Sequence, residues 1–359
     1  MACRPAHEGG CGVGQIPILI EDIDAAWLAD ALGQPITAVR HEQIGEGIGV
    51  SSAVYRAVLT GGDLDSVVVK LPALAEEAVF TATILRMYIR EVAFFQRLAR
   101  RSPIRVPHGY FGEVHEESSA FVQVMEDMGS MRIVDQNEGM AIGDAERAVD
   151  ELACWHAEWW DDSDDAVERG DAVCLSDPVY PAVLPLVFAE GWEKINREMV
   201  VNPVIRNVGA GWSDWMPGAL GRLAGQPHTL LHGDYRADNI LFDADDQVAL
   251  LDFQLIGRGT AAYDLAYFVT QSLAVDVAGS HETRLFNRWI EGLMGAGVPE
   301  ADTTDLWERY REAALFCLVY PVVASRGMDL SDDRQFSLID NMNTRFVRAV
   351  DQLQLADLL

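Results

Sequence analysis

The sequence has few features of membrane or secreted proteins. No apolar run reaches the roughly 18 residues that a membrane-spanning helix requires. Residues 1–15 contain neither the basic start nor the apolar centre of a signal peptide. The five cysteines include no C-x-x-C pair, and their odd number does not suggest a disulfide framework. We therefore expect a cytoplasmic protein without a membrane span and with reduced thiols.

Basic residues are scarce, because 27 Lys and Arg stand against 56 Asp and Glu, which gives a formal net charge of −29. Such a charge repels the phosphates of nucleic acids and anionic lipid surfaces, so we expect neither as a partner. Acidity would suit a cationic substrate, but a solvated acidic surface is commoner. Cys3, His7 and Cys11 could form a metal cluster, yet no partner pair follows at zinc-site spacing. A flexible leader over residues 1–20 is the simpler interpretation.

The first third of the chain has the alternation of strands. We expect five of them, at residues 36–44, 53–59, 66–71, 110–114 and 120–125. Between the third and the fourth strand, apolar residues recur at helical spacing from Ile84 to about Arg101 and predict one long helix. These segments predict a five-stranded antiparallel sheet in an N-terminal lobe over residues 21–125.

Helical periodicity dominates the rest of the chain. Helices are expected at residues 144–160, 185–199, 212–223, 282–294, 305–322 and 337–355. Three short apolar runs, at residues 229–231, 240–242 and 248–253, predict a small β insert. The expected fold class is α+β, with a sheet-rich lobe, a hinge near residue 126 and a larger helical lobe over residues 126–359.

The strongest chemical signal is the run from His232 to Asn239, which reads His-Gly-Asp-Tyr-Arg-Ala-Asp-Asn and is followed by Asp252-Phe253-Gln254. The spacing of Asp234 and Asn239 matches the kinase catalytic loop, in which the Asp accepts the proton of the attacking hydroxyl and the Asn binds Mg²⁺. Asn239 begins one strand of the predicted hairpin and Asp252 ends the other. Their oxygen atoms would lie side by side, and such ligands suit Mg²⁺ between two phosphates.

Lys70 ends the third predicted strand in the run Val67-Val68-Val69-Lys70, which is similar to the Val-Ala-Ile-Lys pattern of kinases. That lysine contacts the α- and β-phosphates of ATP and pairs with a helix glutamate. Glu91 is the preferred partner because it lies within the predicted helix, whereas Glu76 and Glu77 fall in the connection before it. The alternative is an edge-strand lysine and a solvated glutamate.

The segment between the first two predicted strands is rich in glycine, with Gly45, Gly47 and Gly49 followed by Ser51 and Ser52. Glycines there would let backbone N–H groups approach phosphates, so we expect Gly45, Gly47, Gly49 and Ser52 to contact the nucleotide. The spacing departs from G-x-G-x-x-G. An ordinary flexible hairpin loop is the alternative.

At these motifs the sequence resembles the aminoglycoside phosphotransferase and choline kinase group, from about residue 36 to at least residue 325. The Asp-Phe-Gln triplet and the run Tyr263-Asp264-Leu265-Ala266 look most like the ecdysteroid-kinase-like branch. The resemblance implies a bilobal protein-kinase-like fold, ATP as the donor in the N-terminal lobe, and small hydroxylated acceptors. It also implies that Asp264 is a buried carboxylate that holds the backbone of the catalytic loop, and that His232 braces this loop.

Adenine is expected between the lobes, against residues 121–128, with hydrogen bonds to backbone groups near Val124 and Glu126. Arg236 occupies the place of a lysine that protein kinases direct at the transferred phosphate. A surface ion pair is the alternative for Arg236, because guanidinium suits phosphate and carboxylate alike. The rival to an enzyme is a catalytically silent nucleotide-binding scaffold, whose expected mark is the loss of the base, the lysine or a metal ligand. A protein kinase is disfavoured because no Ala-Pro-Glu segment follows Asp252.

The acceptor site is expected in the helical lobe near Asp234. Trp155 and Trp159 share a helix face and could contact an acceptor, although core packing is the simpler interpretation. The acidic run over residues 161–165 could attract an amine, although a solvated loop is more common. Candidate acceptors are amino sugars, other sugars, choline-like alcohols and hydroxylated lipids or steroids.

Overall fold

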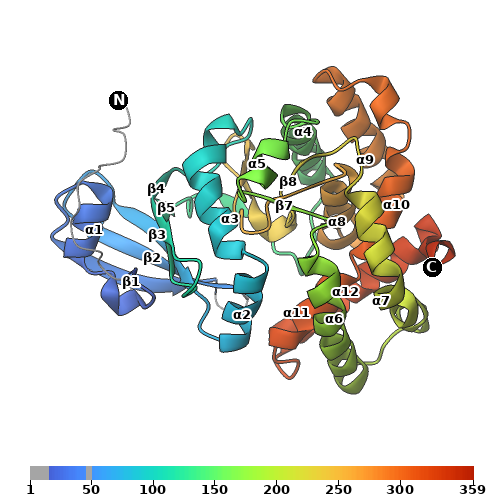
Figure 1. Cartoon of the computed structure of the whole chain (residues 1–359), viewed down its shortest axis with the longest axis horizontal. Coiled ribbons are helices and arrows are strands. Elements are labelled where there is room, and N and C mark those ends of the chain that lie inside the picture. Colours follow the sequence, from blue (N-terminus) through green and yellow to red (C-terminus); the bar gives the residue numbers. More distant parts are fainter. Residues whose placement is uncertain (1–15, 46–50) are drawn as a thin grey trace.

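The computed structural model describes residues 16–45 and 51–359. It contains a five-stranded antiparallel sheet with the strand order β1-β2-β3-β5-β4. The strands are β1 (Ala38–Ile44), β2 (Ser52–Thr60), β3 (Ser66–Pro72), β4 (Gly109–Val114) and β5 (Phe121–Glu126). The sheet lies at one end of the molecule and most helices lie at the other (Figure 1). The expected α+β protein-kinase-like fold is confirmed. The lobe boundary expected near residue 126 stays a prediction, and β5 ends at this residue.

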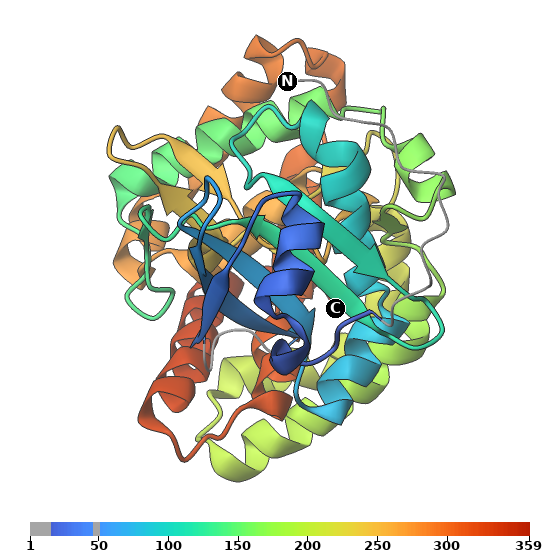
Figure 2. The ribbon, with the colours of Figure 1, turned by 90° about the vertical axis from the view of Figure 1, so that its left-hand side faces the viewer.

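Helices cover both faces of the sheet. They are α1 (Ala25–Leu32), which lies in front of the sheet in Figure 2, and α2 (Glu76–Ile84) with α3 (Met87–Ala93) on the opposite face. Val67 and Val69 of β3 are buried in the cluster beneath α1. Leu71 belongs to the same cluster, and Lys70 lies between Val69 and Leu71 in the strand. Because successive side chains of a strand point to opposite faces, the Lys70 side chain points to the other face, toward α3. Strand alternation therefore places the only charged residue of β3 on the side of the sheet that faces the helical lobe.

The expected leader over residues 1–20 is wrong in its last residues. Ile16 and Ile20 pack against the cluster beneath α1. Cys3, His7 and Cys11 lie outside the described residues.

The helix expected from Ile84 to about Arg101 is wrong as one regular element, because it starts only at α3 and continues as a π-helical turn (Phe94–Leu98) and a 3₁₀ turn (Ala99–Arg101), while α2 precedes it as a separate helix. The break lies at Arg86, whose φ is 55°. The guanidinium of the buried Arg90 donates to the carbonyl of Leu85 at 2.7 Å and satisfies this group where the helix stops. Glu76 and Glu77, expected in a connection, lie in the first turn of α2.

The helical lobe has one large apolar core. Its helices are α4 (Ile142–Glu158), α5 (Asp164–Glu168), α6 (Val179–Glu198), α7 (Pro203–Leu223), α8 (Ala262–Ser272), α9 (Val275–Gly295), α10 (Leu306–Phe316), α11 (Val319–Ala324) and α12 (Asp333–Leu353). Helix α4 packs along α9, and α8 packs along α10. The helix expected at residues 305–322 is wrong as a single element, because α10 ends at Phe316 and the chain restarts as α11 at Val319.

The predicted β insert is two separate sheets. One has the order β10-β9-β6 and contains β6 (Arg132–Ile133), β9 (Ile240–Phe242) and β10 (Val248–Leu250). The other has the order β7-β11-β8 and contains β7 (Val173–Cys174), β8 (Thr229–Leu231) and β11 (Gly257–Gly259). The catalytic-loop motif, residues 232–239, therefore connects β8 of the second sheet to β9 of the first.

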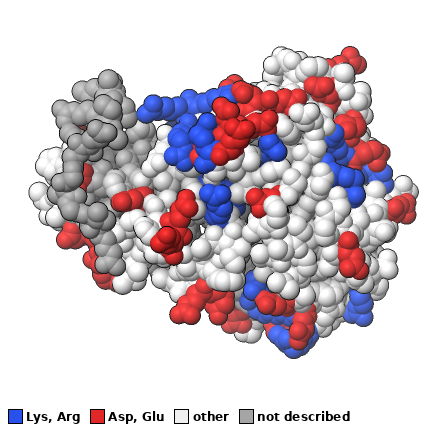
Figure 3. Space-filling model, viewed as in Figure 1, with Lys and Arg blue, Asp and Glu red and all other residues white. Residues whose placement is uncertain are grey.

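Acidic and basic side chains lie next to one another on the face of the molecule in Figure 3, so the negative net charge does not form one continuous acidic surface there. Over residues 16–45 and 51–359, none of the helices combines the length and the apolar character that a bilayer span needs.

Candidate active site

A buried carboxylate holds the segment that carries Asp234. Asp264, in the first turn of α8, accepts hydrogen bonds from the backbone N–H of His232 at 2.8 Å and of Gly233 at 2.9 Å. Nε2 of His156 lies 3.2 Å from the same carboxylate, and Nδ1 of His156 accepts from the indole of Trp289 at 3.2 Å. Because Nδ1 is the acceptor, Nε2 carries the proton and donates to Asp264. Asp264 thus accepts hydrogen bonds from two backbone N–H groups of the loop and from His156. The resemblance implied this loop-holding role for Asp264.

Gly233 allows this loop to touch the chain that follows Asp252. Its φ is +81°, and a Cβ there would lie 2.1 Å from the carbonyl oxygen of Leu255. No L side chain fits this approach. On the other side, the hydroxyl of Tyr320 donates to the Gly233 carbonyl at 2.9 Å. The loop is therefore fixed from α8, from α11 and from the segment after Asp252.

Asn239 and Asp234 contact each other directly. Nδ2 of Asn239 donates to the backbone carbonyl and to Oδ2 of Asp234, both at 2.9 Å. The amide nitrogen is used twice by the same residue, so Oδ1 of Asn239 is the oxygen that remains for a cation. His232 supports Asp234 through Nδ1, which accepts from the Asp234 N–H at 3.3 Å, and its Nε2 lies 3.0 Å from the Leu251 carbonyl oxygen.

Arg236 faces Asp234 from the other side. Its Nε lies 3.3 Å from Oδ1 of Asp234, and its Nη1 contacts Asp238 and, at 3.2 Å, Oε1 of Gln136. Burial opposes the charge, but the carboxylates of Asp234 and Asp238 outweigh burial and raise the pKa of Arg236 above its usual value. Only 16% of the side chain is exposed, so the ion pairs of Arg236 are largely buried, and its contact with a transferred phosphate stays a prediction. Arg236 is an internal counter-ion of the expected base.

The two expected metal ligands are brought together by the β9–β10 hairpin. The N–H of Leu251 donates to the carbonyl of Asn239 at 2.9 Å, which places Asp252 directly beyond the end of the ladder. Asp252 has a φ of +65°. Its Oδ1 accepts from Lys70 Nζ at 3.2 Å and its Oδ2 accepts from Gln254 Nε2 at 3.2 Å.

This pair fits Mg²⁺. One carboxylate and one amide oxygen are hard ligands, and the ion commonly keeps waters and phosphate oxygens in its other positions. Within the part of the chain that the structure describes, no group of three or more His, Cys, Asp and Glu could hold a metal by itself. The remaining ligands would therefore come from a bound nucleotide and water.

Lys70 is in contact with Glu91, the glutamate preferred from the sequence, at 2.6 Å. Burial opposes the charge on Lys70, but Asp252 and Glu91 outweigh burial and raise its pKa. Burial raises the pKa of Glu91 to about 7, although the attraction of Lys70 works in the opposite direction. The lysine thus bridges a helix of the sheet lobe to a carboxylate of the helical lobe.

The glycine-rich segment is described only at its ends. Gly45 has a φ of +71°, whereas Gly47 and Gly49 lie outside the described residues. Ser52 is buried at the start of β2, and its hydroxyl finds no partner among the described residues. The phosphate contacts of Gly45, Gly47, Gly49 and Ser52 stay predictions.

The expected adenine site is less open than the sequence suggested. Val124 lies within both ladders of β5, opposite Val69 and Phe111, so its backbone faces neighbouring strands. The N–H of Glu126 donates to the His108 carbonyl at 2.9 Å. The carbonyl of Glu126 is thus the better of the two expected adenine contacts, and both stay predictions.

Two tyrosines of the site were missed from the sequence. The ring of Tyr267 on α8 stacks on that of Tyr320 on α11, with centroids 3.7 Å apart. Burial and the charge of the neighbouring Asp234 raise the pKa of Tyr267 well above its usual value. The signal was available, because Tyr267 follows Asp264 by three residues on one helix and so shares its face.

The segment expected to recognise the acceptor is used structurally. Trp155 and Trp159 are buried, and the indole N–H of Trp155 donates to the Leu230 carbonyl at 2.8 Å. In the acidic run, Asp162 pairs with Arg101 at 2.7 Å and Asp164 pairs with Arg258. Core packing and local ion pairs therefore account for these residues.

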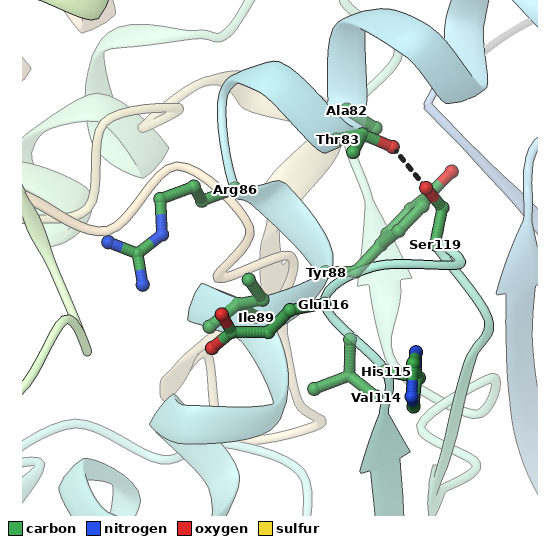
Figure 4. Close-up of a pocket in the computed structure, with 9 residues that line it drawn as sticks. All are labelled: Ala82, Thr83, Arg86, Tyr88, Ile89, Val114, His115, Glu116 and Ser119. Atoms are coloured by element: carbon green, nitrogen blue, oxygen red, sulfur yellow. Dashed lines mark hydrogen bonds between the residues drawn. The ribbon is translucent and has the colours of Figure 1, made fainter.

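A small pocket lies away from this site, between α2, α3 and the turn that joins β4 to β5 (Figure 4). Thr83 and Ser119 form a hydrogen bond of 2.7 Å at its edge. None of the residues expected to bind nucleotide or metal lines this pocket.

Comparisons with known proteins show the family and the fold of this chain. A family model described as the phosphotransferase enzyme family matches residues 42–312. No curated protein matches the sequence. Choline kinase from Cryptosporidium parvum Iowa II has a similar structure, with 10% identity over 88% of this chain and 89% of that chain and a TM-score of 0.55.

Two further solved structures are similar. An amicoumacin kinase in complex with AMP-PNP, Ca²⁺ and Ami has 12% identity over 86% of this chain and 87% of that chain, with a TM-score of 0.55. A GDP complex of an aminoglycoside 2′-phosphotransferase IIIa variant has 16% identity over 86% of this chain and 92% of that chain, with a TM-score of 0.54. At these identities the likeness shows a shared fold.

Proposed function

Because the chain belongs to the phosphotransferase enzyme family, we propose that it transfers the γ-phosphate of ATP to a hydroxyl group of a small molecule. The single observation that carries the proposal is the contact of Asp234 with Asn239. Across the hairpin, Asn239 accepts a backbone hydrogen bond from Leu251, the residue directly before Asp252. A base and two metal ligands at one point are what phosphoryl transfer to an alcohol requires.

Each polar residue of the site can then be assigned a role in phosphoryl transfer. Asp234 accepts the proton of the attacking hydroxyl, while Arg236 beside it balances its charge. Lys70, fixed by Glu91, contacts the α- and β-phosphates. Asn239 and Asp252 would hold Mg²⁺, which would supply positive charge against the phosphates. The nucleotide and Ca²⁺ bound to the similar amicoumacin kinase support a nucleotide and a divalent cation here.

The alternative of a catalytically silent scaffold is not favoured. The expected base, lysine and metal ligands are all present, with Asn239 in contact with Asp234 and Lys70 in contact with Glu91 and Asp252. The acceptor class rests on the resemblance alone. Amino sugars, other sugars, choline-like alcohols and hydroxylated lipids or steroids are the candidates, and the ecdysteroid-kinase-like branch stays a prediction from the Asp-Phe-Gln triplet.

The test is a screen of hydroxylated metabolites and antibiotics for ATP consumption, with mass detection of a phosphorylated product. Asp234→Asn should lower kcat by ~10² to 10⁴ while MgATP still binds, because it removes the general base and leaves the phosphate and metal contacts. Asp245→Asn is the matched control, since Asp245 is an exposed carboxylate at the tip of the β9–β10 hairpin. Normal kcat in Asp234→Asn would rule out its role as the base.

A further inference from the structure

Gln254, the third residue of the Asp-Phe-Gln triplet, connects the two lobes through its side-chain amide. It is buried, with 7% of its surface exposed. Its Nε2 donates to Oδ2 of Asp252 at 3.2 Å. Its Oε1 accepts from the hydroxyl of Ser51 at 2.8 Å. Ser51 belongs to the sheet lobe and lies directly before β2, 203 residues away in sequence.

The orientation of this amide follows from its partners. A carboxylate only accepts hydrogen bonds, so the amide nitrogen of Gln254 must face Asp252. The amide oxygen then faces Ser51, and the serine hydroxyl must be the donor. The bonds run in one direction, from Ser51 through Gln254 to Asp252, and every polar atom of the Gln254 side chain is used.

Ser51 is itself held in place. The hydroxyl of Tyr88 donates to the Ser51 carbonyl at 2.8 Å and accepts from the N–H of Ala73 at 3.1 Å. The ring of Tyr88 stacks on Phe121 of β5, with centroids 4.6 Å apart. The start of β2, the end of β3 and helix α3 thus share one hydroxyl group, which gives Ser51 a fixed position relative to the sheet.

Asp252 is therefore oriented by the sheet lobe through both of its oxygens. Lys70 contacts Oδ1 from β3, and Gln254 relays the position of Ser51 to Oδ2. Its left-handed φ of +65° is unfavourable for a residue with a side chain, so neighbouring contacts must hold it. A glycine in place of Gln254, as in the Asp-Phe-Gly triplet of protein kinases, could supply neither contact.

We propose that Gln254 is a positioning residue that sets the metal-binding orientation of Asp252 according to the position of Ser51 in the sheet lobe. This inference rests on the proposed function, because it assigns Asp252 to the metal. It requires that loss of the Gln254 amide weakens Mg²⁺-dependent nucleotide binding more than nucleotide binding without metal. It also requires that Ser51 acts through Gln254.

The experiment is calorimetric titration of the full chain with ADP, with and without Mg²⁺. The ratio of the two dissociation constants measures the metal enhancement. Gln254→Leu keeps the size of the side chain and removes both hydrogen bonds, and we expect the enhancement to fall about tenfold, the effect of a hydrogen bond to a charged group. Metal-free ADP should bind as in the wild type.

Ser51→Ala removes only the interlobe bond and should lower the enhancement by roughly threefold. Ser51→Thr keeps the hydroxyl and should restore it. The double variant should match Gln254→Leu, since the bond to Gln254 is the one that links the Ser51 hydroxyl to Asp252 among residues 16–45 and 51–359. Ser66→Ala is the matched control, because Ser66 also donates from the sheet to a carboxylate, Oδ2 of Asp127 at 2.7 Å, and should leave the enhancement unchanged.

An unchanged enhancement in Gln254→Leu, or additive effects of the two single variants, would overturn the inference while the proposed function stands. A wild-type protein with no Mg²⁺-dependent nucleotide binding would overturn both. Ser51→Ala is a small change on a partly exposed residue, so the inference stays testable if Gln254→Leu fails to fold. In that case a Ser51→Ala protein with full enhancement refutes it.

Discussion

Removal of the Lys70 amine should destabilise the protein strongly. Lys70 Nζ lies 2.6 Å from Oε1 of Glu91, and the two side chains are 8% and 0% exposed. In Lys70→Met the carboxylate of Glu91 remains buried without its partner. Breaking a buried pair in this way costs about 3–5 kcal/mol of unfolding free energy, mostly because an uncompensated charge is left behind. Oε2 of Glu91 has no other partner among the described residues, so no neighbour can take the place of Lys70.

The size of this loss should depend on pH. Burial raises the pKa of Glu91 to about 7 even while Lys70 lowers it, so Lys70→Met should raise it further. A carboxyl group whose pKa is higher in the folded state stabilises the protein fully below its unfolded pKa of ~4.3. That stabilisation is lost as pH rises through the folded pKa. The deficit of Lys70→Met should therefore be small at about pH 6, where Glu91 is protonated, and large at about pH 8.5.

The assay is urea unfolding of the wild type and of Lys70→Met at both pH values. Lys194→Met is the control, because Lys194 donates to backbone carbonyls of Arg326 and Met328 and faces no buried carboxylate. The double change of Lys70 to Met and Glu91 to Leu should recover much of the loss, since it removes the fully buried carboxylate and leaves only Asp252, whose side chain is 24% exposed, without the lysine. An equal deficit at the two pH values, or a double variant as unstable as Lys70→Met, would refute the reasoning.

Three further changes test other parts of the site. Asp252→Ala should abolish the Mg²⁺ dependence of ADP binding, which calorimetry measures, and unchanged dependence would exclude Asp252 as a ligand. Arg236→Lys should lower kcat about tenfold with the KM for ATP unchanged, because an ammonium cannot keep the contacts of the guanidinium with Asp238 and Gln136; a changed KM alone would instead assign Arg236 to ATP binding. Burial lowers the pKa of His232, although the charge of Asp264 works in the opposite direction. The contribution of neutral His232 to the free energy of unfolding is therefore present above the unfolded-state pKa of ~6.5 and is lost as the pH falls below that value. Urea unfolding of His232→Asn should therefore show a weaker loss of stability between about pH 6.5 and 5 than the wild type, and equal slopes would contradict this.

The parts of the site that the sequence predicted depend on short segments. Asp234 and Asn239 lie in one loop, and Asp252 is joined to them by a hairpin, so local spacing was sufficient. Lys70 and Glu91 needed only the strand pattern and a helix after it. The contact between Ser51 and Gln254 spans the whole fold, and no local pattern indicates it.

The fold features that were missed have physical causes. Every residue of α8 is buried, so this helix has no solvent-exposed face. The break at Arg86 has no glycine or proline to mark it, and the side chain that satisfies the Leu85 carbonyl there comes from Arg90, one turn later. The acidic run looked free because its partners, Arg101 and Arg258, are distant in sequence.

The approach of Gly233 to the Leu255 carbonyl limits how this family member can vary. Any substitution at Gly233 must push apart the loop that carries the base and the segment that carries the metal ligand, because the obstacle is backbone and cannot rotate away. A randomised library of the catalytic loop should therefore return only glycine at this codon among active clones, whatever acceptor is selected. New acceptor preference has to arise from side chains elsewhere in the helical lobe, so substrate choice and the phosphoryl-transfer machinery can diverge independently in this chain.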